Sequence, residues 1–180
     1  SAEQTLAHEI THMIQEKYFK DLEVRFHDEL QAWNALIEGD AGFTADKYIE
    51  EATATPTVSD GLAFLFSSDK PSVASHLAMV MPESLAELWL FRYKYGEGFV
   101  STLYGVGGWE KVNAAYVNPP LTTEQILHPE KYLESESFVL VNSIPLNSSY
   151  WSLVKMERLG EHFIRVLSAT RLNSSIHSFK

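Results

Sequence analysis

The chain has 180 residues, of which 45% are hydrophobic, and a formal net charge of −10. This length and composition predict one globular domain with a sizeable core, and they exclude a chain that is disordered over most of its length. The acidic balance, without a cluster of Lys and Arg, argues against a nucleic-acid partner. Because cysteine is absent, disulfides and thiolate zinc sites are excluded, and a metal ion would need ligands from His, Asp and Glu.

Membrane and targeting signals are not evident in the sequence. No apolar run approaches the ~18–20 residues of a membrane span, and no signal peptide is recognisable. The chain begins with Ser1 rather than Met, which suggests processing or excision. A secreted or cell-envelope location would follow if a signal or anchor has been removed.

The first third of the chain has helical periodicity. A helix is predicted over residues 1–19, where Ser1 and Gln4 have capping-box spacing. An apolar stripe recurs at helical period, formed by Leu6, Ile10, Met13, Ile14 and Tyr18. The uncharged residues Ala7, Ile10, Thr11 and Met13 suit a buried helix. A second helix is predicted from Asp28 to about Ile37, and helical character resumes after "EGDAG" over 46–54.

The middle of the chain is divided by turn signals. Residues 57–72 are expected to be a loop, except that "GLAFLF" fits a short buried helix or strand. A helix opens at Glu83, and its glycines at 96 and 98 are expected to bend or break it. The glycines from 105 to 108 end it, and a further short helix is predicted over 109–117.

The last third is more varied. Residues 118–132 are expected to form a loop with one helical turn, begun by Thr122 and stopped by Pro129. Residues 137–146 have the β-branched content of a strand, and 150–169 predict a strong amphipathic helix. We therefore predict a single mainly α domain over residues 1–180, with α+β as the alternative.

The stretch "HEITH" is an HExxH pattern on the first predicted helix. His8 and His12 are four residues apart, so both imidazoles project from one face and can reach the same zinc ion. Glu9, beside His8, would act as general base toward a zinc-bound water. The structural alternative is two histidines on a solvated helix face.

A catalytic zinc site needs a third protein ligand, and Glu38 is the best candidate. It ends the apolar run "AWNALI", where an unpaired carboxylate would be costly to bury. An antiparallel return of the second helix would bring Glu38 to the level of the histidines. The alternative is a helix-end glutamate that faces water. Asp40 is a weaker candidate, as a ligand, as a support for a histidine N–H, or as a turn residue.

The stretches "LAHEITHMIQ" and "ALIEGDA" resemble the gluzincin zinc metallopeptidases, which are thermolysin-like in the broad sense. The resemblance implies a zincin-like helical core with zinc ligands His8, His12 and Glu38 and with Glu9 as the base. The stretch from "GEGFVSTLYG" to "TTEQILHPEKY" is similar to a bacterial and archaeal family of predicted metallopeptidases. Its members combine HExTHxxQ and EGDA with a block of the form TTEQ-x-LHPEKY.

Two departures from the thermolysin-like pattern stand out. Gly42 occupies the position where those enzymes carry an aspartate that supports a histidine, so the support must come from elsewhere. Zincin peptidases also place a β-sheet before the HExxH helix, whereas only seven residues precede His8 here. We therefore expect this chain to be part of a larger protein.

Further polar residues are candidates for supporting roles. His128, Tyr116 and Tyr132 are candidates for stabilising the oxyanion of a tetrahedral intermediate. Glu161 is a candidate hydrogen-bond acceptor for a zinc-binding histidine. The alternatives are structural: His128, together with Glu124, would bond backbone in an irregular loop, and Glu161 would lie on the surface.

The sequence thus favours a zinc-dependent peptidase that acts on a peptide or protein substrate. A helical binding or scaffold domain with a vestigial or metal-free HExxH site is the alternative from another class. A metal-dependent hydrolase or lyase that acts on other substrates is a third hypothesis.

Overall fold

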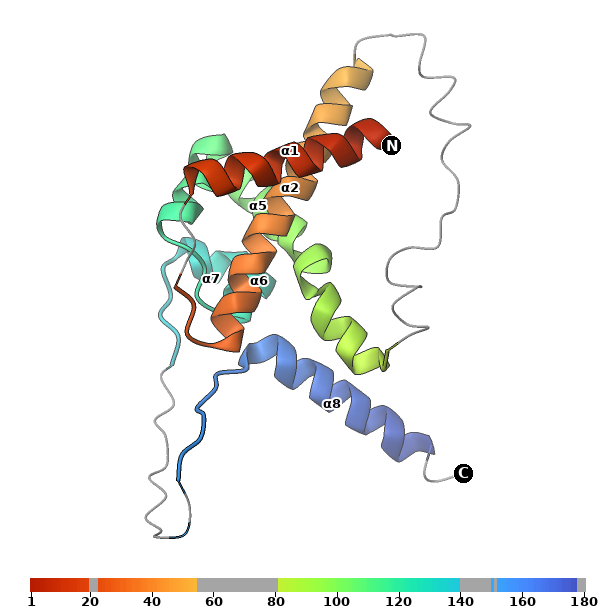
Figure 1. Cartoon of the computed structure of the whole chain (residues 1–180), viewed down its shortest axis with the longest axis vertical. Helices are drawn as coiled ribbons and strands as arrows, with labels where there is room; N and C mark the ends of the chain where they lie inside the picture. The colour runs from red at the N-terminus through yellow and green to blue at the C-terminus, as the bar shows by residue number, and fades with distance from the viewer. Residues whose placement is uncertain (20–22, 55–80, 140–149, 151, 178–180) are drawn as a thin grey trace.

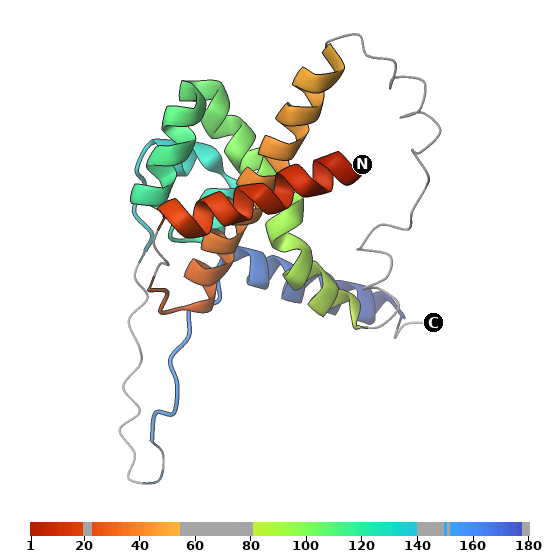
Figure 2. The ribbon, with the colours of Figure 1, turned by 45° about the horizontal axis from the view of Figure 1, so that its top comes forward.

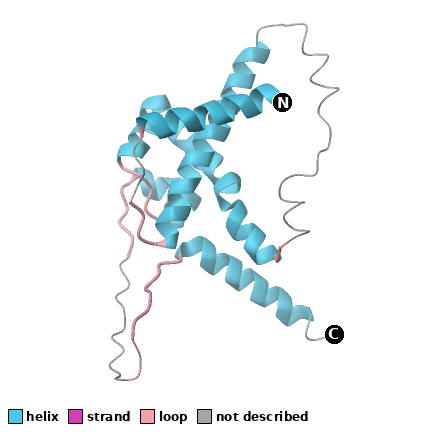
Figure 3. Ribbon diagram, viewed as in Figure 1, coloured by secondary structure: helices cyan, strands magenta, loops and turns pink. Residues whose placement is uncertain are grey.

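The computed structural model describes residues 1–19, 23–54, 81–139, 150 and 152–177, and these are mainly helical, as predicted. No strand occurs among them, as Figure 3 shows. The helices are α1 (Ala2–Tyr18), α2 (His27–Ala54), α5 (Glu83–Val117), α6 (Thr123–Leu127), α7 (Pro129–Leu133) and α8 (Gly160–His177). None of the described helices is long and apolar enough to cross a membrane.

Two long helices, α2 and α5, cross each other and form the centre of the molecule (Figure 1). Helix α1 lies across α2 near the middle of α2, and the same crossing is visible after rotation (Figure 2). Helices α6 and α7 pack against α5, and α8 contacts both α5 and α6. The predicted HExxH helix therefore packs on the helix that carries Glu38.

The hydrophobic core lies mainly between α2 and α5. Leu36 from α2 and Phe91, Phe99 and Leu103 from α5 are almost fully buried, and Ile126 adds a contribution from α6. Burial of one such side chain stabilises the fold by about 1.5–3 kcal/mol. The core thus fixes the crossing of α2 and α5, which in turn positions Glu38.

Helix α2 is continuous, so the predicted interruption at "EGDAG" is wrong. Gly39 lies against the backbone of Gly96 on α5, and a Cβ at Gly39 would come within 2.2 Å of the Gly96 carbonyl carbon. A Cβ at Gly96 would likewise come within 2.2 Å of the Ala35 oxygen. These glycines permit a close crossing of the two helices. This tertiary requirement outweighs the cost of glycine in a helix, which is about 1 kcal/mol relative to alanine.

Helix α5 passes through Gly96 and Gly98 without a break, but it is kinked further on. Gly107 and Gly108 have non-helical backbone angles, and Gly108 has a φ of 60°. The predicted end of the helix near these glycines is therefore a kink, after which the predicted 109–117 helix continues to Val117. Figure 1 shows the chain reversing at this point.

The predicted helix over 150–169 begins only at Gly160. Residues 152–159 are irregular, and this segment accepts hydrogen bonds from the first backbone N–H groups of α2. His27 N donates to Glu157 Oε1 at 2.6 Å, and Asp28 N donates to Arg158 O at 2.9 Å. Gly160 itself has a φ of 77°, and a Cβ there would clash with the Asp28 carboxylate. Tertiary contacts thus override the amphipathic pattern.

Helix α1 has the predicted capping box between Ser1 and Gln4. The expectation of a buried helix is wrong for most of α1: Thr11 is buried, but the apolar stripe is exposed. The exposed fractions are Leu6 60%, Ile10 45%, Met13 69%, Ile14 49% and Tyr18 67%. The opposite face, with buried Thr11 and Gln15, packs toward α2, and Gln15 Nε2 donates across the interface to Ile37 O at 3.0 Å.

Other predictions concern short segments. The turn predicted within 118–132 is two turns, α6 and α7, with Thr122 as the cap of α6 and Pro129 at the start of α7. Residues 137–139 form no strand, and 140–146, the rest of the predicted strand, lie outside the described residues. The predicted loop at 57–72, with "GLAFLF", also lies outside them.

Candidate metal centre

The side chains of His8, His12 and Glu38 converge where α1 crosses α2. Their Nε2 and Oε2 atoms all lie within 4.8 Å of one another. The two imidazole Nε2 atoms are 3.0 Å apart, and Glu38 Oε2 lies 3.5 Å from His8 Nε2 and 3.4 Å from His12 Nε2. All three side chains are partly buried. The structure therefore brings together the three residues predicted as metal ligands.

These separations fit a tetrahedral zinc ion. Ligand atoms at about 2.0–2.1 Å from zinc, at tetrahedral angles, lie roughly 3.3–3.5 Å from each other. The measured separations of 3.0, 3.4 and 3.5 Å lie close to this range. Two imidazoles and one carboxylate are also the ligand types that zinc accepts, and three protein ligands leave a fourth position for chemistry.

Gln15 determines which nitrogen of His12 can bind a metal. The Gln15 amide nitrogen donates to Ile37 O at 3.0 Å and to Asp40 Oδ2 at 3.0 Å, and both of these atoms only accept. Gln15 Oε1 is therefore the atom that faces His12 Nδ1 at 2.8 Å, and it accepts a hydrogen bond from the N–H of that nitrogen. In the neutral imidazole, the lone pair is then on His12 Nε2, the nitrogen that faces His8 and Glu38.

Gln15 is itself held by Asp40 and Tyr116. The Tyr116 hydroxyl donates to Asp40 Oδ2 at 2.6 Å and lies 2.8 Å from Gln15 Nε2, whose two N–H groups are shared among Ile37 O, Asp40 Oδ2 and this hydroxyl. Burial raises the pKa of Tyr116 far above its usual value, and the neighbouring Asp40 carboxylate raises it further. The Tyr116 ring stacks on Phe19 with 3.8 Å between centroids. Asp40 thus supports His12 through Gln15, and the Tyr116 hydroxyl is engaged in the same network.

Glu38 has a second partner on α5. Its other carboxylate oxygen, Oε1, accepts a hydrogen bond from the Tyr93 hydroxyl at 3.3 Å. The pKa of Tyr93 is raised by its partial burial and then by the Glu38 carboxylate, with a smaller effect from Glu9. Glu9, the predicted base, is exposed on α1 directly after His8. Tyr93 thus lies beside the cluster.

Two cavities flank the cluster. One, of about 410 Å³, lies beside His8 and is lined by Gly42 and by the carboxyl groups of Asp46 and Glu97. The other, of about 180 Å³, lies beside His12 and has both aromatic and polar residues in its wall, among them Phe19, Trp33, Tyr116 and Gln15. The cluster is therefore accessible from two sides of different chemical character.

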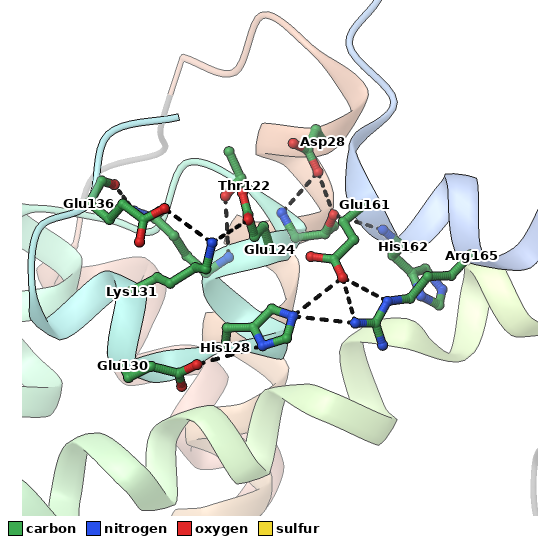
Figure 4. A network of polar contacts seen from close by, with 12 residues as sticks. Asp28, Thr122, Glu124, His128, Glu130, Lys131, Glu136, Glu161, His162 and Arg165 are labelled. Carbon is green, nitrogen blue, oxygen red and sulfur yellow. Dashed lines mark hydrogen bonds and ion pairs between the residues drawn. The ribbon is translucent and has the colours of Figure 1, made fainter. Parts of the chain in front are cut away.

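His128 is not brought to the cluster. It lies in a polar network between α6, α7 and α8 (Figure 4), in which His128 Nε2 is 3.3 Å from Glu161 Oε1. Glu161 Oε1 also accepts from Arg165 Nε at 2.7 Å, so Glu161 does not support a zinc-binding histidine. Glu124 pairs with Lys131, with 2.6 Å between Oε1 and Nζ. His128 and Glu124 thus pair with side chains on helices rather than with backbone in an irregular loop, and Glu161 is half-buried rather than on the surface.

Tyr132 is not at the cluster either, because its hydroxyl donates to Asn118 O at 2.7 Å. Two supporting residues were not predicted. Gln15 had a local signal, its position three residues after His12 on the same helix face. Tyr93 had none, since it contacts Glu38 from a different helix, 55 residues away.

Comparison with known proteins adds no further information: no family model, curated protein or solved structure matches this chain.

Proposed function

We propose that this chain is a zinc-dependent peptidase of gluzincin type, with His8, His12 and Glu38 as zinc ligands and Glu9 as general base. The observation that carries the proposal is the convergence of the three ligand atoms within 3.0–3.5 Å of one another. The hydrogen bond that fixes the tautomer of His12 supports it further, because such bonds raise metal affinity.

The bound zinc would polarise the carbonyl of the scissile peptide bond and lower the pKa of a water molecule. Glu9 is exposed, and it lies on the same helix as two of the ligands. Its carboxylate would accept the proton of the attacking water at an Oε atom and then deliver that proton to the departing amine. The cavities beside His8 and His12 would give room for a peptide substrate.

Metal content tests the site. The purified chain, saturated with zinc and then dialysed, is expected to retain one zinc ion per molecule, and His12→Ala is expected to lose it. His27→Ala is the matched control, since His27 lies at the start of α2 and, among the described residues, is not part of a group that could hold a metal ion. Equal and near-zero zinc in the wild type and in His12→Ala would refute the proposed site.

Peptide cleavage tests the activity. Loss of the general base typically removes a factor of about 10²–10⁴ in rate, so Glu9→Gln should retain zinc and lose nearly all cleavage of a mixed peptide library. Zinc binding without any cleavage that depends on Glu9 would favour the alternative, a helical binding domain with a vestigial site.

A further inference from the structure

The two oxygens of the Glu38 carboxylate have different surroundings. Oε2 faces both histidines, at 3.5 Å from His8 Nε2 and 3.4 Å from His12 Nε2. Oε1 accepts the hydrogen bond from the Tyr93 hydroxyl. The carboxylate therefore offers one oxygen to the cluster while the other is engaged on the side of α5.

We propose that Tyr93 is a positioning residue that keeps Glu38 a ligand through one oxygen only. The inference rests on the proposed zinc site. A carboxylate that binds through both oxygens occupies an additional coordination position, and a catalytic zinc site needs that position for water or substrate. A hydroxyl that donates to Oε1 stabilises the orientation in which only Oε2 points at the metal.

The position of Tyr93 follows from the fold. The close contact between Gly39 and Gly96 sets α2 against α5, and Glu38 and Tyr93 lie within one helical turn of it. The Tyr93 ring packs against Trp89 with 5.2 Å between centroids. The helix crossing thus places the hydroxyl within reach of Glu38.

A cation further restrains the ring. The Arg92 guanidinium lies 5.8 Å from the centroid of Tyr93 and 5.2 Å from that of Trp89. A cation near an aromatic face is attracted by the electrons of the ring, which favours this arrangement of the three side chains. Tyr116 has a different role, because its hydroxyl is hydrogen-bonded to Asp40 and Gln15 and not to the Glu38 carboxylate.

Cobalt(II) in place of zinc provides a direct test, because its visible absorption is strong in four-coordinate sites and weak in five- or six-coordinate ones. The wild type should give the strong spectrum. Tyr93→Phe should give a weaker one, as Glu38 turns to bind through both oxygens, and its zinc affinity should fall by about 10-fold or more. Tyr95→Phe is the matched control on the same helix, since Tyr95 packs against Phe91 and His162.

The outcomes separate the two proposals. If the wild type binds no cobalt or zinc, the metal centre fails, and the role of Tyr93 fails with it. If the wild type binds metal and Tyr93→Phe has the same spectrum and the same zinc affinity, the metal centre stands and the positioning role is overturned. Urea unfolding of both variants shows whether a changed spectrum reflects a changed fold.

Discussion

The contact between Gly39 and Gly96 makes a quantitative prediction. In Gly39→Ala, the new Cβ would lie 2.2 Å from the Gly96 carbonyl carbon and 2.3 Å from its oxygen. To reach an ordinary contact of 3.4 Å, the two backbones would have to separate by about 1.2 Å. Both atoms belong to backbone in a packed core, so no flexible side chain can absorb this displacement.

Overpacking of this kind costs about 3 kcal/mol, at the upper end of the usual range, while alanine returns about 1 kcal/mol of helix propensity. We expect a net loss of about 2 kcal/mol, which lowers the midpoint of urea unfolding by roughly 1 M. Zinc affinity should fall as well, since Glu38 precedes Gly39 and shares its displacement.

Gly98→Ala is the control for this experiment. Gly98 lies within α5, and a Cβ there would have nothing within 4 Å. Only the propensity gain remains, so this variant should be more stable than the wild type by up to about 1 kcal/mol. A Gly39→Ala protein that unfolds at the wild-type urea concentration or above it would refute the reasoning.

Three further predictions concern single side chains. Asp28→Ala should lower the free energy of unfolding in urea by about 3 kcal/mol, because Asp28 Oδ1 accepts hydrogen bonds from the backbone N and the Oγ1 of buried Thr123. A decrease of less than about 1 kcal/mol would contradict this. Gln15→Leu should weaken zinc binding by about 10–100-fold, measured by competition with a chelating dye, because His12 Nδ1 loses its hydrogen-bond acceptor. An unchanged zinc affinity would count against the role of Gln15. Burial lowers the pKa of His162, so the unfolded chain binds more protons and stability should fall as the pH drops below about 6.5. His162→Gln should reduce that fall in the urea midpoint, and an equal fall in both proteins would exclude His162 as its source.

The cluster of His8, His12 and Glu38 was predictable because it depends on helix periodicity and on two helices that are adjacent in sequence. The spacing of His8 and His12 places both on one face of any helix, and the short connector before α2 brings Glu38 back toward them. Gln15 was missed although its spacing from His12 carries the same kind of signal. The contact of Tyr93 with Glu38 could not be predicted from the sequence, because it depends on how α5 crosses α2.

The errors in the fold have a common physical origin. An interruption was predicted at "EGDAG", yet the helix is continuous there, and the close approach of α5 requires a residue without a side chain at Gly39. Residues 150–159 have an amphipathic pattern, yet Glu157 and Arg158 accept the first N–H groups of α2. In both places, contacts between distant segments outweigh local propensity.

The packing of α1 has a consequence for how the molecule opens. Its inward face meets α2 through hydrogen bonds, which contribute about 0.5–1.5 kcal/mol each, whereas α2 and α5 share a continuous apolar core. The backbone amides of α1 should therefore exchange with deuterium sooner than those of α2 and α5. An ion held by ligands from α1 and α2 would cross-link the two helices. Metal binding should therefore slow the deuterium exchange of the backbone amides of α1, with little change in α2 and α5.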